Sequence, residues 1–315
     1  MIPALVLTAG LATRLRPLSL VRAKAALPVA GSPLIIRILR GLAGSGVTEI
    51  VLNLHHLPHT LTRVVGDGSQ LGLRVRYSWE MPVLGSAGGP RHALPLLGAS
   101  TFLIVNGDTL VDLDVAALVK AHQESGALIT MAAAPNAEPH KYGGIVAPAD
   151  GVVTGFTRRG SFEPSYHFVG VQVAEAKAFA SLAAGTPHES VAALYPALVS
   201  ERPGAVRVHL CSAEFLDIGT PGDYLKTSFL LARREGGSMA PGAGARVDPT
   251  ARIEESILWD DVDVGAGTLL RQCIVADGAR VPEDTSWIGV TLRRADGGEL
   301  APGERRIGDL AVSSL

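Results

Sequence analysis

The chain has 315 residues, which is enough for one large α/β domain and a smaller second one. Its 28 basic and 30 acidic residues nearly cancel and form no long run of one sign, which excludes a broad surface for nucleic acid or an anionic membrane. Only two cysteines, no apolar stretch near the roughly 20 residues of a membrane helix and no basic signal at the start favour a globular cytoplasmic protein.

The chain up to residue 236 alternates short aliphatic runs with helical patterns. In chain order we expect strands at residues 4–8, 49–54, 73–77, 102–106, 128–132 and 169–173, helices at 34–42, 87–97, 115–124 and 221–234, and a surface loop with histidines at 55–59. This alternation predicts a Rossmann-like α/β domain over residues 1–236 with a mostly parallel sheet. Ligands of such sheets bind at the carboxyl ends of the strands, so the chemistry is expected just after Thr8 and Asn106.

Glycines at residues 236–244 indicate a linker, and beyond it the apolar residues repeat with a period of six. The three series are Val247, Ile253 and Trp259; Leu258, Val264 and Leu270; and Leu269, Val275, Val281 and Trp287. A hexapeptide period is typical of a parallel β-helix, whose turns bury their apolar residues against one another. We therefore expect a β-helix at residues 245–292 and a tail at 293–315, with an ordinary β-meander as the alternative.

The most informative segment starts at Leu7 and reads Leu-Thr-Ala-Gly-Leu-Ala-Thr-Arg-Leu-Arg-Pro-Leu, with Lys24 following it. It connects the first strand to a helix through a turn of small residues. Backbone N–H groups in such a turn can point at phosphate oxygens, and Arg14 and Lys24 supply positive charge nearby. We therefore expect this segment to bind the phosphates of a nucleotide.

Together with Leu27-Pro28-Val29, this segment resembles the Gly-x-Gly-Thr-Arg-Leu-x-Pro-Leu…Pro-Lys-Pro…Pro-Val signature of the sugar-nucleotide pyrophosphorylases. The resemblance spans residues 2–234, and the hexapeptide region resembles the left-handed β-helix that many members carry. Ala9 and Ala12 stand where the family often has glycine, so their backbone conformations affect how closely phosphates can approach. The residues that the resemblance implies in nucleotide binding and catalysis are Leu7, Ala9, Gly10, Thr13, Arg14 and Lys24.

Two aspartates match the metal-binding motifs of this family. Asp108 ends Val105-Asn106-Gly107-Asp108 after a buried strand, and Asp217 lies in Leu-Asp-Ile-Gly-Thr-Pro, where the family has its second aspartate. The resemblance implies that both bind Mg2+, which prefers carboxylate oxygens and keeps water and phosphate oxygens in its shell. A helix cap or a turn is the structural alternative for each aspartate.

Residues 84–90 read Leu-Gly-Ser-Ala-Gly-Gly-Pro and resemble the loop that packs against base and ribose in this family. Gly85, Ser86 and Ala87 are therefore expected to contact the nucleotide. Glu80 lies just upstream and could accept hydrogen bonds from N1–H and N2–H of guanine, or from N3–H of uracil or thymine. This side chain slightly favours guanine, and a solvated loop glutamate is the alternative.

Residues 142–146 and 155–160 resemble the segments that line the sugar side, and with residues 168–172 they give the candidates Gly144, Arg158, Arg159 and Val169. A structural role is the alternative for Arg158, Phe168 and Val169. Arg159 stands where the family has a lysine for the sugar phosphate, and a guanidinium can also hold a phosphate. Arg158 stands where a sugar-contacting glutamate is expected. Phe168-Val169-Gly170 resembles the form seen in the mannose, heptose and N-acetylmuramate branches, so an unusual sugar is expected.

The resemblance implies an enzyme that transfers a nucleoside monophosphate from a nucleoside triphosphate to a sugar 1-phosphate and releases pyrophosphate, with Mg2+ as cofactor. GTP and mannose 1-phosphate are the substrates expected first. The alternatives are a UTP-dependent enzyme for MurNAc or hexose 1-phosphate and a non-catalytic relative that binds a sugar nucleotide. No nucleic-acid or membrane partner is expected, and the β-helix is expected to form a homo-oligomer.

Overall fold

The computed structural model describes residues 2–237, 239–295 and 300–315. The first of two compact units comprises the described residues of Met1–Gly10, Ile35–Pro58 and Val65–Leu216. The second comprises Leu11–Leu34, His59–Val64 and the described residues of Asp217–Leu315. The expected linker includes residue 238 and the expected tail includes residues 296–299, and these lie outside the described part of the chain.

The first unit is built around a nine-stranded sheet. Its strands are β1 (Ala4–Leu7), β4 (Glu49–Leu54), β5 (Arg74–Trp79), β6 (Thr101–Asn106), β8 (Ile129–Pro135), β9 (Gly144–Val146), β10 (Gly155–Thr157), β11 (Tyr166–Glu175) and β12 (Val206–Leu210). The pairs β1–β4, β1–β6, β4–β5 and β8–β12 are parallel, whereas β11 lies antiparallel between β6 and β8. The prediction of a mostly parallel α/β sheet is confirmed, and β9, β10 and β11 are its antiparallel part.

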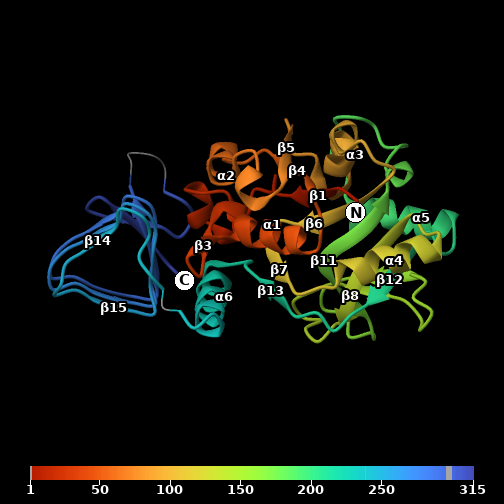
Figure 1. The fold of residues 1–315 in the computed structure, drawn as a ribbon. Helices are drawn as coiled ribbons and strands as arrows, with labels where there is room; N and C mark the ends of the chain where they lie inside the picture. Colours follow the sequence, from red (N-terminus) through yellow and green to blue (C-terminus); the bar gives the residue numbers. More distant parts are fainter. Residues whose placement is uncertain (1, 238, 296–299) are drawn as a thin grey trace. The chain divides into compact units, whose positions relative to one another are not determined.

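Helices and short strands complete this unit (Figure 1). They are α1 (Leu34–Gly44), α3 (Gly85–Leu97), α4 (Val115–Ser125), α5 (Tyr195–Glu201), β7 (Thr109–Val111) and β13 (Phe215–Asp217), of which Leu34 and Asp217 belong to the second unit. Helix α2 (Pro58–Val65) has only its two end residues in this unit, and His59–Val64 belong to the second unit. Helix α3 packs on β1 and β4, and α4 packs on β8 and β11. Between the layers lies an apolar core that includes Leu5, Phe102 and Met131, none of which is exposed. The surface loop expected at 55–59 ends at Leu57, because Pro58 begins α2 as a favourable first-turn proline.

In the second unit, segment 11–34 forms three short 3-10 turns and a small hairpin. These elements are η1 (Thr13–Leu15), η2 (Leu18–Leu20), η3 (Lys24–Ala26), β2 (Pro28–Val29) and β3 (Ser32–Pro33). The long helix α6 (Pro221–Arg234) begins with Thr220, whose Oγ1 accepts a hydrogen bond from the Asp223 N–H at 3.1 Å. The predicted helix at 221–234 is therefore confirmed with the expected boundaries.

The remainder of the second unit is a three-sided parallel coil, as Figure 1 shows. Its strands are β14 (Arg246–Val247), β15 (Arg252–Glu254), β16 (Ile257–Leu258), β17 (Asp263–Val264), β18 (Leu269–Arg271), β19 (Ile274–Val275), β20 (Arg280–Val281), β21 (Ser286–Ile288) and β22 (Val290–Arg294). The three sides are β14–β17–β20, β15–β18–β21 and β16–β19–β22, and all their pairs are parallel. Strand β24 (Leu310–Ser314) adds to β22 antiparallel and pairs with β23 (Arg305–Ile307), so the predicted β-helix is confirmed and ends in an antiparallel ladder.

One turn of this coil takes 17 residues, because paired residues such as Val247, Val264 and Val281 differ by 17. A strict period of six would give 18. Leu258 and Leu270 of the second predicted series are buried in the core of the β-helix, whereas Leu269 of the third series does not belong to that core. Trp259 of the first series is also outside that core, although it is fully buried elsewhere in the second unit.

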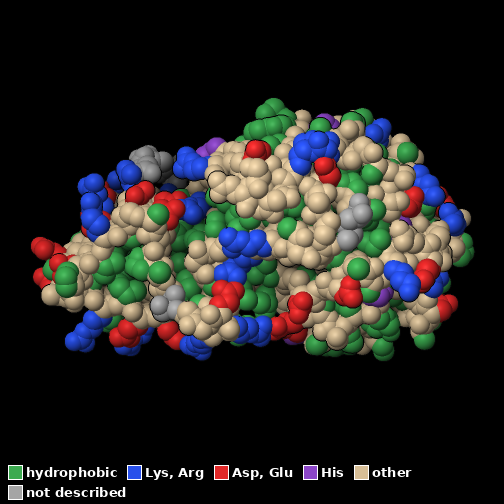
Figure 2. Space-filling view, viewed as in Figure 1, with side chains coloured by type: hydrophobic (Ala, Val, Ile, Leu, Met, Phe, Trp, Pro, Cys, Tyr) green, Lys and Arg blue, Asp and Glu red, His purple; other side chains and the backbone are tan. Residues whose placement is uncertain are grey.

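Basic and acidic side chains are interspersed on the face that Figure 2 shows, with no patch of one sign. Among the described residues, no helix combines the length and the apolar character that crossing a bilayer requires.

Candidate functional site

The first unit contains a cavity of about 230 Å³ where parallel strands end. Leu7 ends β1, Asn53 lies near the end of β4 and Asn106 ends β6, so the cavity lies at the carboxyl edge of the sheet. This is the edge at which open α/β sheets bind ligands. The lining residues are Leu7, Ala9, Gly10, Asn53, Glu80, Val83, Gly85, Ser86, Asn106 and Asp108.

Most residues that the sequence assigns to the nucleotide in this unit line the cavity. Leu7, Ala9 and Gly10 come from the loop after β1, Gly85 and Ser86 begin α3, and Glu80 follows β5. The loop after β1 ends about 70 residues before Glu80 in the chain, and the parallel topology brings these segments together. Their role in nucleotide binding stays a prediction, as does that of Ala87, which is fully buried in the first turn of α3.

A buried hydrogen-bond network forms one wall of the cavity. The Asn53 side chain accepts from the Thr8 N–H at 2.6 Å and donates to Glu80 Oε1 at 2.7 Å. The other oxygen of Glu80 accepts from the Leu84 N–H at 2.8 Å. Because Glu80 is only 4% exposed and both of its oxygens accept internal bonds, this carboxylate is part of the scaffold that joins three loops.

The first turn of α3 is held by the loop at residues 186–190. Ser86 donates to Glu189 Oε2 at 2.6 Å, and the Ala87 N–H donates to the His188 carbonyl at 2.9 Å. Gly85 has a φ of +75°, and a Cβ there would lie 2.6 Å from Glu189 Oε1. Glycine is thus required at this corner both by conformation and by space.

Asp108 reaches the cavity from the turn after β6. The preceding Gly107 donates its N–H to the Leu7 carbonyl at 3.0 Å, and a Cβ on Gly107 would lie 2.6 Å from that oxygen. This close approach fixes the Asp108 turn against the end of β1. Thr109 donates to Asp108 Oδ1 at 3.1 Å.

The described residues contain no cluster of three or more histidine, cysteine, aspartate or glutamate side chains that could cage a cation. A cation beside Asp108 would therefore complete its shell with water and ligand oxygens. That is how Mg2+ binds beside phosphates, so the donor set fits Mg2+ better than a metal that needs several protein ligands.

The residues assigned to the sugar side lie around β9, β10 and β11. Gly144 begins β9 and donates its N–H to Thr157 Oγ1 at 3.0 Å. Arg158 and Arg159 follow β10 and are exposed, and neither forms an ion pair with any residue that the structure describes. Val169 is 1% exposed, so almost none of its surface is open to a ligand.

The other assigned residues belong to the second unit. Thr13 and Arg14 form the turn η1, Lys24 begins η3, and Asp217 ends β13 just before α6. Thr227 of α6 donates to the Asp217 carbonyl at 3.1 Å, which ties this aspartate to the helix. The two units thus each carry part of the assigned set.

Ala12 precedes η1 with a φ of 47° and a ψ of 46°, which is the left-handed conformation. Glycine adopts this conformation at little cost, whereas alanine costs about 1 kcal/mol there. Ser19 donates to the Ala12 carbonyl at 2.9 Å and helps hold the turn. Ala9 is not among the residues of positive φ, so only one of the two alanine replacements sits where glycine would be easier.

Sequence reasoning did not assign Asn53, Val83 or Asn106 to the site, although all three line the cavity. Asn53 and Asn106 lie at or near strand ends, where the rule for α/β sheets already directs attention. Asn106 lies inside the motif that ends at Asp108, so the sequence already indicated that it is near the site. Asn53 had no motif, and only the pairing of β1 with β4 shows that it faces Thr8.

Comparison with known proteins gives the family. Residues 3–234 match the family described as nucleotidyl transferase, and residues 241–297 match the GlmU-like C-terminal hexapeptide family. The mannose-1-phosphate guanylyltransferase of Mycobacterium tuberculosis is 27% identical over 299 residues, which cover 86% of this chain and 83% of that protein. The N-acetylmuramate alpha-1-phosphate uridylyltransferase of Neisseria meningitidis is 47% identical over 116 residues, which cover 36% of this chain and 50% of that protein.

Among solved structures, HddC from Yersinia pseudotuberculosis matches with a TM-score of 0.64 at 22% identity, covering 73% of this chain and 100% of that one. At this identity the match shows the shared fold. The expected α/β fold, hexapeptide region and family are confirmed. The chain therefore belongs to the nucleotidyl transferase family and is, as predicted, a nucleotidyltransferase enzyme with a C-terminal hexapeptide β-helix.

Proposed function

We propose that this enzyme transfers a nucleoside monophosphate from a nucleoside triphosphate to a sugar 1-phosphate, with GTP and mannose 1-phosphate as the preferred pair. The observation that carries this proposal is the cavity at the carboxyl edge of the sheet, lined by the loop after β1, the start of α3 and Asp108. The similarity to mannose-1-phosphate guanylyltransferases over most of both chains supports the choice of substrates.

In this proposal the turn at residues 10–13 and Arg14 hold the triphosphate, and Lys24 steadies the reacting phosphates. Arg159 holds the phosphate of the sugar, whose oxygen attacks the α-phosphorus in line with the departing pyrophosphate. Arg158, Gly144 and Val169 line the sugar. Such a reaction depends on positioning and on neutralising charge, and it needs no protein nucleophile.

We propose that Asp108 and Asp217 hold Mg2+. The position of Asp108 in the lining of the cavity and the lack of a three-ligand cluster among the described residues support a hydrated cation that is completed by the substrate. Bound Mg2+ would neutralise charge on the phosphates of the triphosphate.

The base is proposed to lie against Gly85, Ser86 and Ala87. Both oxygens of Glu80 already accept internal hydrogen bonds, but each carboxylate oxygen can accept a second one. Glu80 can thus receive N1–H or N2–H of guanine through the remaining positions. Its fixed orientation would favour one base over another, because the network leaves the carboxylate no freedom to turn.

A UTP-dependent enzyme acting on N-acetylmuramate or hexose 1-phosphate is the second candidate. The 47% identity to an N-acetylmuramate uridylyltransferase is higher than the 27% to the guanylyltransferase, but it covers a shorter part of the chain. The N3–H of uracil could be accepted by the same carboxylate. The two candidates therefore differ in base and sugar and share the reaction.

We also propose that the protein works in the cytoplasm and forms a homo-oligomer through its β-helix. The division into a nucleotidyltransferase domain at 1–236, a β-helix at 245–292 and a tail at 293–315 belongs to the same proposal. The family matches at 3–234 and 241–297 support these boundaries.

The test is pyrophosphate release with Mg2+, using ATP, CTP, GTP, UTP and dTTP against mannose, glucose, GlcNAc, MurNAc and heptose 1-phosphates. The proposal expects release that requires both substrates and is fastest with GTP and mannose 1-phosphate. Fastest release with UTP would select the second candidate. Silence with every pair, from protein that still binds a nucleotide, would refute the proposed reaction for these sugars.

A further inference from the structure

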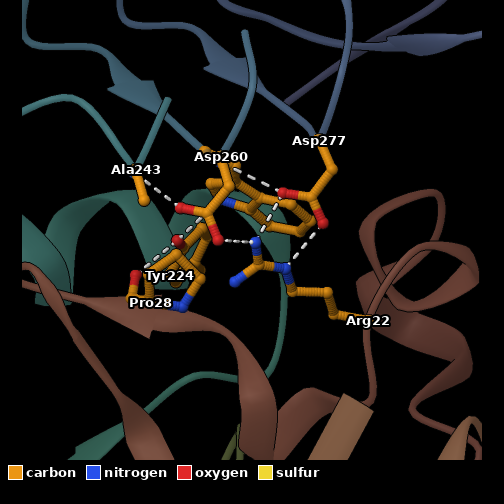
Figure 3. Close-up of polar contacts among 7 residues, drawn as sticks. Arg22, Pro28, Tyr224, Ala243, Asp260 and Asp277 are labelled. Carbon is orange, nitrogen blue, oxygen red and sulfur yellow. Dashed lines mark hydrogen bonds and ion pairs between the residues drawn. The ribbon is translucent and has the colours of Figure 1, made fainter. Parts of the chain in front are cut away.

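Arg22 of segment 11–34 points at Asp260 and Asp277, which together form an acidic fork on the β-helix (Figure 3). Its Nε donates to Asp277 Oδ2 at 2.7 Å and its Nη2 donates to Asp277 Oδ1 at 2.6 Å. The same Nη2 donates to Asp260 Oδ2 at 2.5 Å. The guanidinium also lies 5.3 Å from the centroid of the Trp259 ring. Such a paired, stacked arrangement suits arginine and no other side chain.

The two aspartates come from successive turns of the coil, and backbone N–H groups of the β-helix hold both carboxylates. The Asp260 N–H donates to Asp277 Oδ1 at 3.2 Å, and Asp260 Oδ1 accepts from the Ala243 N–H at 2.8 Å. The Arg22 side chain is 14% exposed, whereas Asp260 and Asp277 are 43% and 31% exposed, so the guanidinium is largely buried and the carboxylates keep contact with solvent. Burial opposes the charge of Arg22, but the hydrogen bonds and charges of Asp277 and then Asp260 outweigh it and raise its pKa above the ordinary value.

Pro28, six residues after Arg22, is a second point at which segment 11–34 is attached. The Tyr224 hydroxyl donates to the Pro28 carbonyl at 2.6 Å and accepts from Trp259 Nε1–H at 3.0 Å. Tyr224 and Trp259 are both fully buried. Segment 11–34 is therefore attached at Pro28 to Tyr224 of α6, which in turn bonds Trp259 of the β-helix, in addition to its attachment at Arg22.

Lys24 lies between these two anchors. Its turn η3 has three residues, and a 3-10 turn of that length cannot maintain its own conformation. The neighbouring Ala23 N–H donates to Thr60 Oγ1 at 3.1 Å, which adds a third support. The conformation of the turn therefore depends on contacts outside it, and those at Arg22 and Pro28 come from the β-helix and from α6.

From this arrangement we infer that Arg22, together with Asp260 and Asp277, is a positioning group through which the β-helix holds the Lys24 turn in its nucleotide-binding conformation. This inference rests on the proposed role of Lys24 with the phosphates. An ordered turn binds a nucleotide without first losing conformational freedom, so a loosened anchor should weaken nucleotide binding while leaving the sugar side unaffected.

The test compares Asp277→Ala with Asp263→Ala in the full-length chain. Asp263 accepts from Arg246 at 2.9 Å on another side of the same β-helix and does not contact segment 11–34 through any described bond, so it is the matched control. We expect Asp277→Ala to raise the KM for the nucleoside triphosphate by about tenfold. The KM for the sugar 1-phosphate should stay within about twofold, and Asp263→Ala should change neither.

Amide hydrogen exchange gives a readout that does not require activity. Asp277→Ala should speed exchange across residues 22–28, whereas Asp263→Ala should not. Asp277→Asn retains the shape of the side chain and should give a smaller effect in the same direction, which keeps the test valid if Asp277→Ala folds poorly. Unchanged exchange and unchanged nucleotide KM in both variants would overturn the inference.

A double substitution separates positioning from general stability. If Asp277 acts through Lys24, then Asp277→Ala should change the nucleotide KM of Lys24→Ala by less than about twofold. An undiminished tenfold effect in that background would overturn the inference and leave the proposed reaction intact. If the natural chain releases no pyrophosphate, the proposed function fails, and exchange together with the Kd of the nucleotide still decides the role of Arg22.

Discussion

Asn53→Ala should destabilise the first unit more than the loss of one polar side chain usually does. The substitution leaves two buried groups without their partners, the Thr8 N–H and Glu80 Oε1, which Asn53 meets at 2.6 and 2.7 Å. Asn53 is 3% exposed and Glu80 is 4% exposed. Each unpaired buried group costs about 1–3 kcal/mol, and water that enters the adjoining cavity recovers part of this, so we expect a loss of about 2–4 kcal/mol.

The assay is urea denaturation followed by far-UV circular dichroism, with Arg74→Ala as the control. Arg74 pairs with Glu49, but its side chain is 70% exposed, so this substitution should cost less than about 1 kcal/mol. A double-mutant cycle with Glu80→Ala should show that the two losses are not additive, because both substitutions break one network. A loss for Asn53→Ala no larger than for Arg74→Ala would refute the reasoning from unpaired buried groups.

Three further outcomes are expected. Asp108→Asn should lower kcat by about a thousandfold in pyrophosphate release, because an amide binds Mg2+ poorly, and near-normal turnover would remove Asp108 from the metal site. Burial lowers the pKa of His122 from 6.5 and outweighs the hydrogen bond that its ring donates to Glu175, so the neutral ring contributes to the free energy of unfolding above pH 6.5, and this contribution should be lost as the pH falls below 6.5; His122→Gln should flatten this dependence in urea titrations across pH. Gly85→Ala should lower Tm and raise the nucleotide KM, since its Cβ meets neighbouring oxygens, whereas Gly41→Ala in α1, with open space around it, should raise Tm slightly; equal effects would contradict this.

The sequence predicted the sheet and most helices because their signals are local. Aliphatic runs at β1, β4 and β6 and the capped start of α6 agree with the structure to within a residue or two. The antiparallel strand β11 was expected as one more strand, but its direction depends on pairing with β6 and β8. Direction is a property of the whole sheet, so no local pattern could show it.

Site residues were predictable where they lie in a sequence motif. They were unpredictable where their role depends on hydrogen-bond partners from other parts of the chain. Gly85, Ser86 and Asp108 were assigned from motifs, and all three line the cavity. Glu80 was assigned to the base, yet its two internal hydrogen bonds require Asn53 and the Leu84 N–H, which come from different loops. A carboxylate in a sequence does not show whether its oxygens face a ligand or the protein.

The length of the coil turn explains why the attachment of Arg22 could not be foreseen. A strict period of six stacks Asp260 on residue 278, which is a glycine, and no acidic fork results. The 17-residue turn stacks Asp260 on Asp277 instead, and both carboxylates then meet one guanidinium. The register of the β-helix therefore determines whether segment 11–34 has a binding partner there. Inserting one residue between Asp260 and Asp277 would separate the two carboxylates, and we expect it to affect nucleotide binding in the same direction as Asp277→Ala.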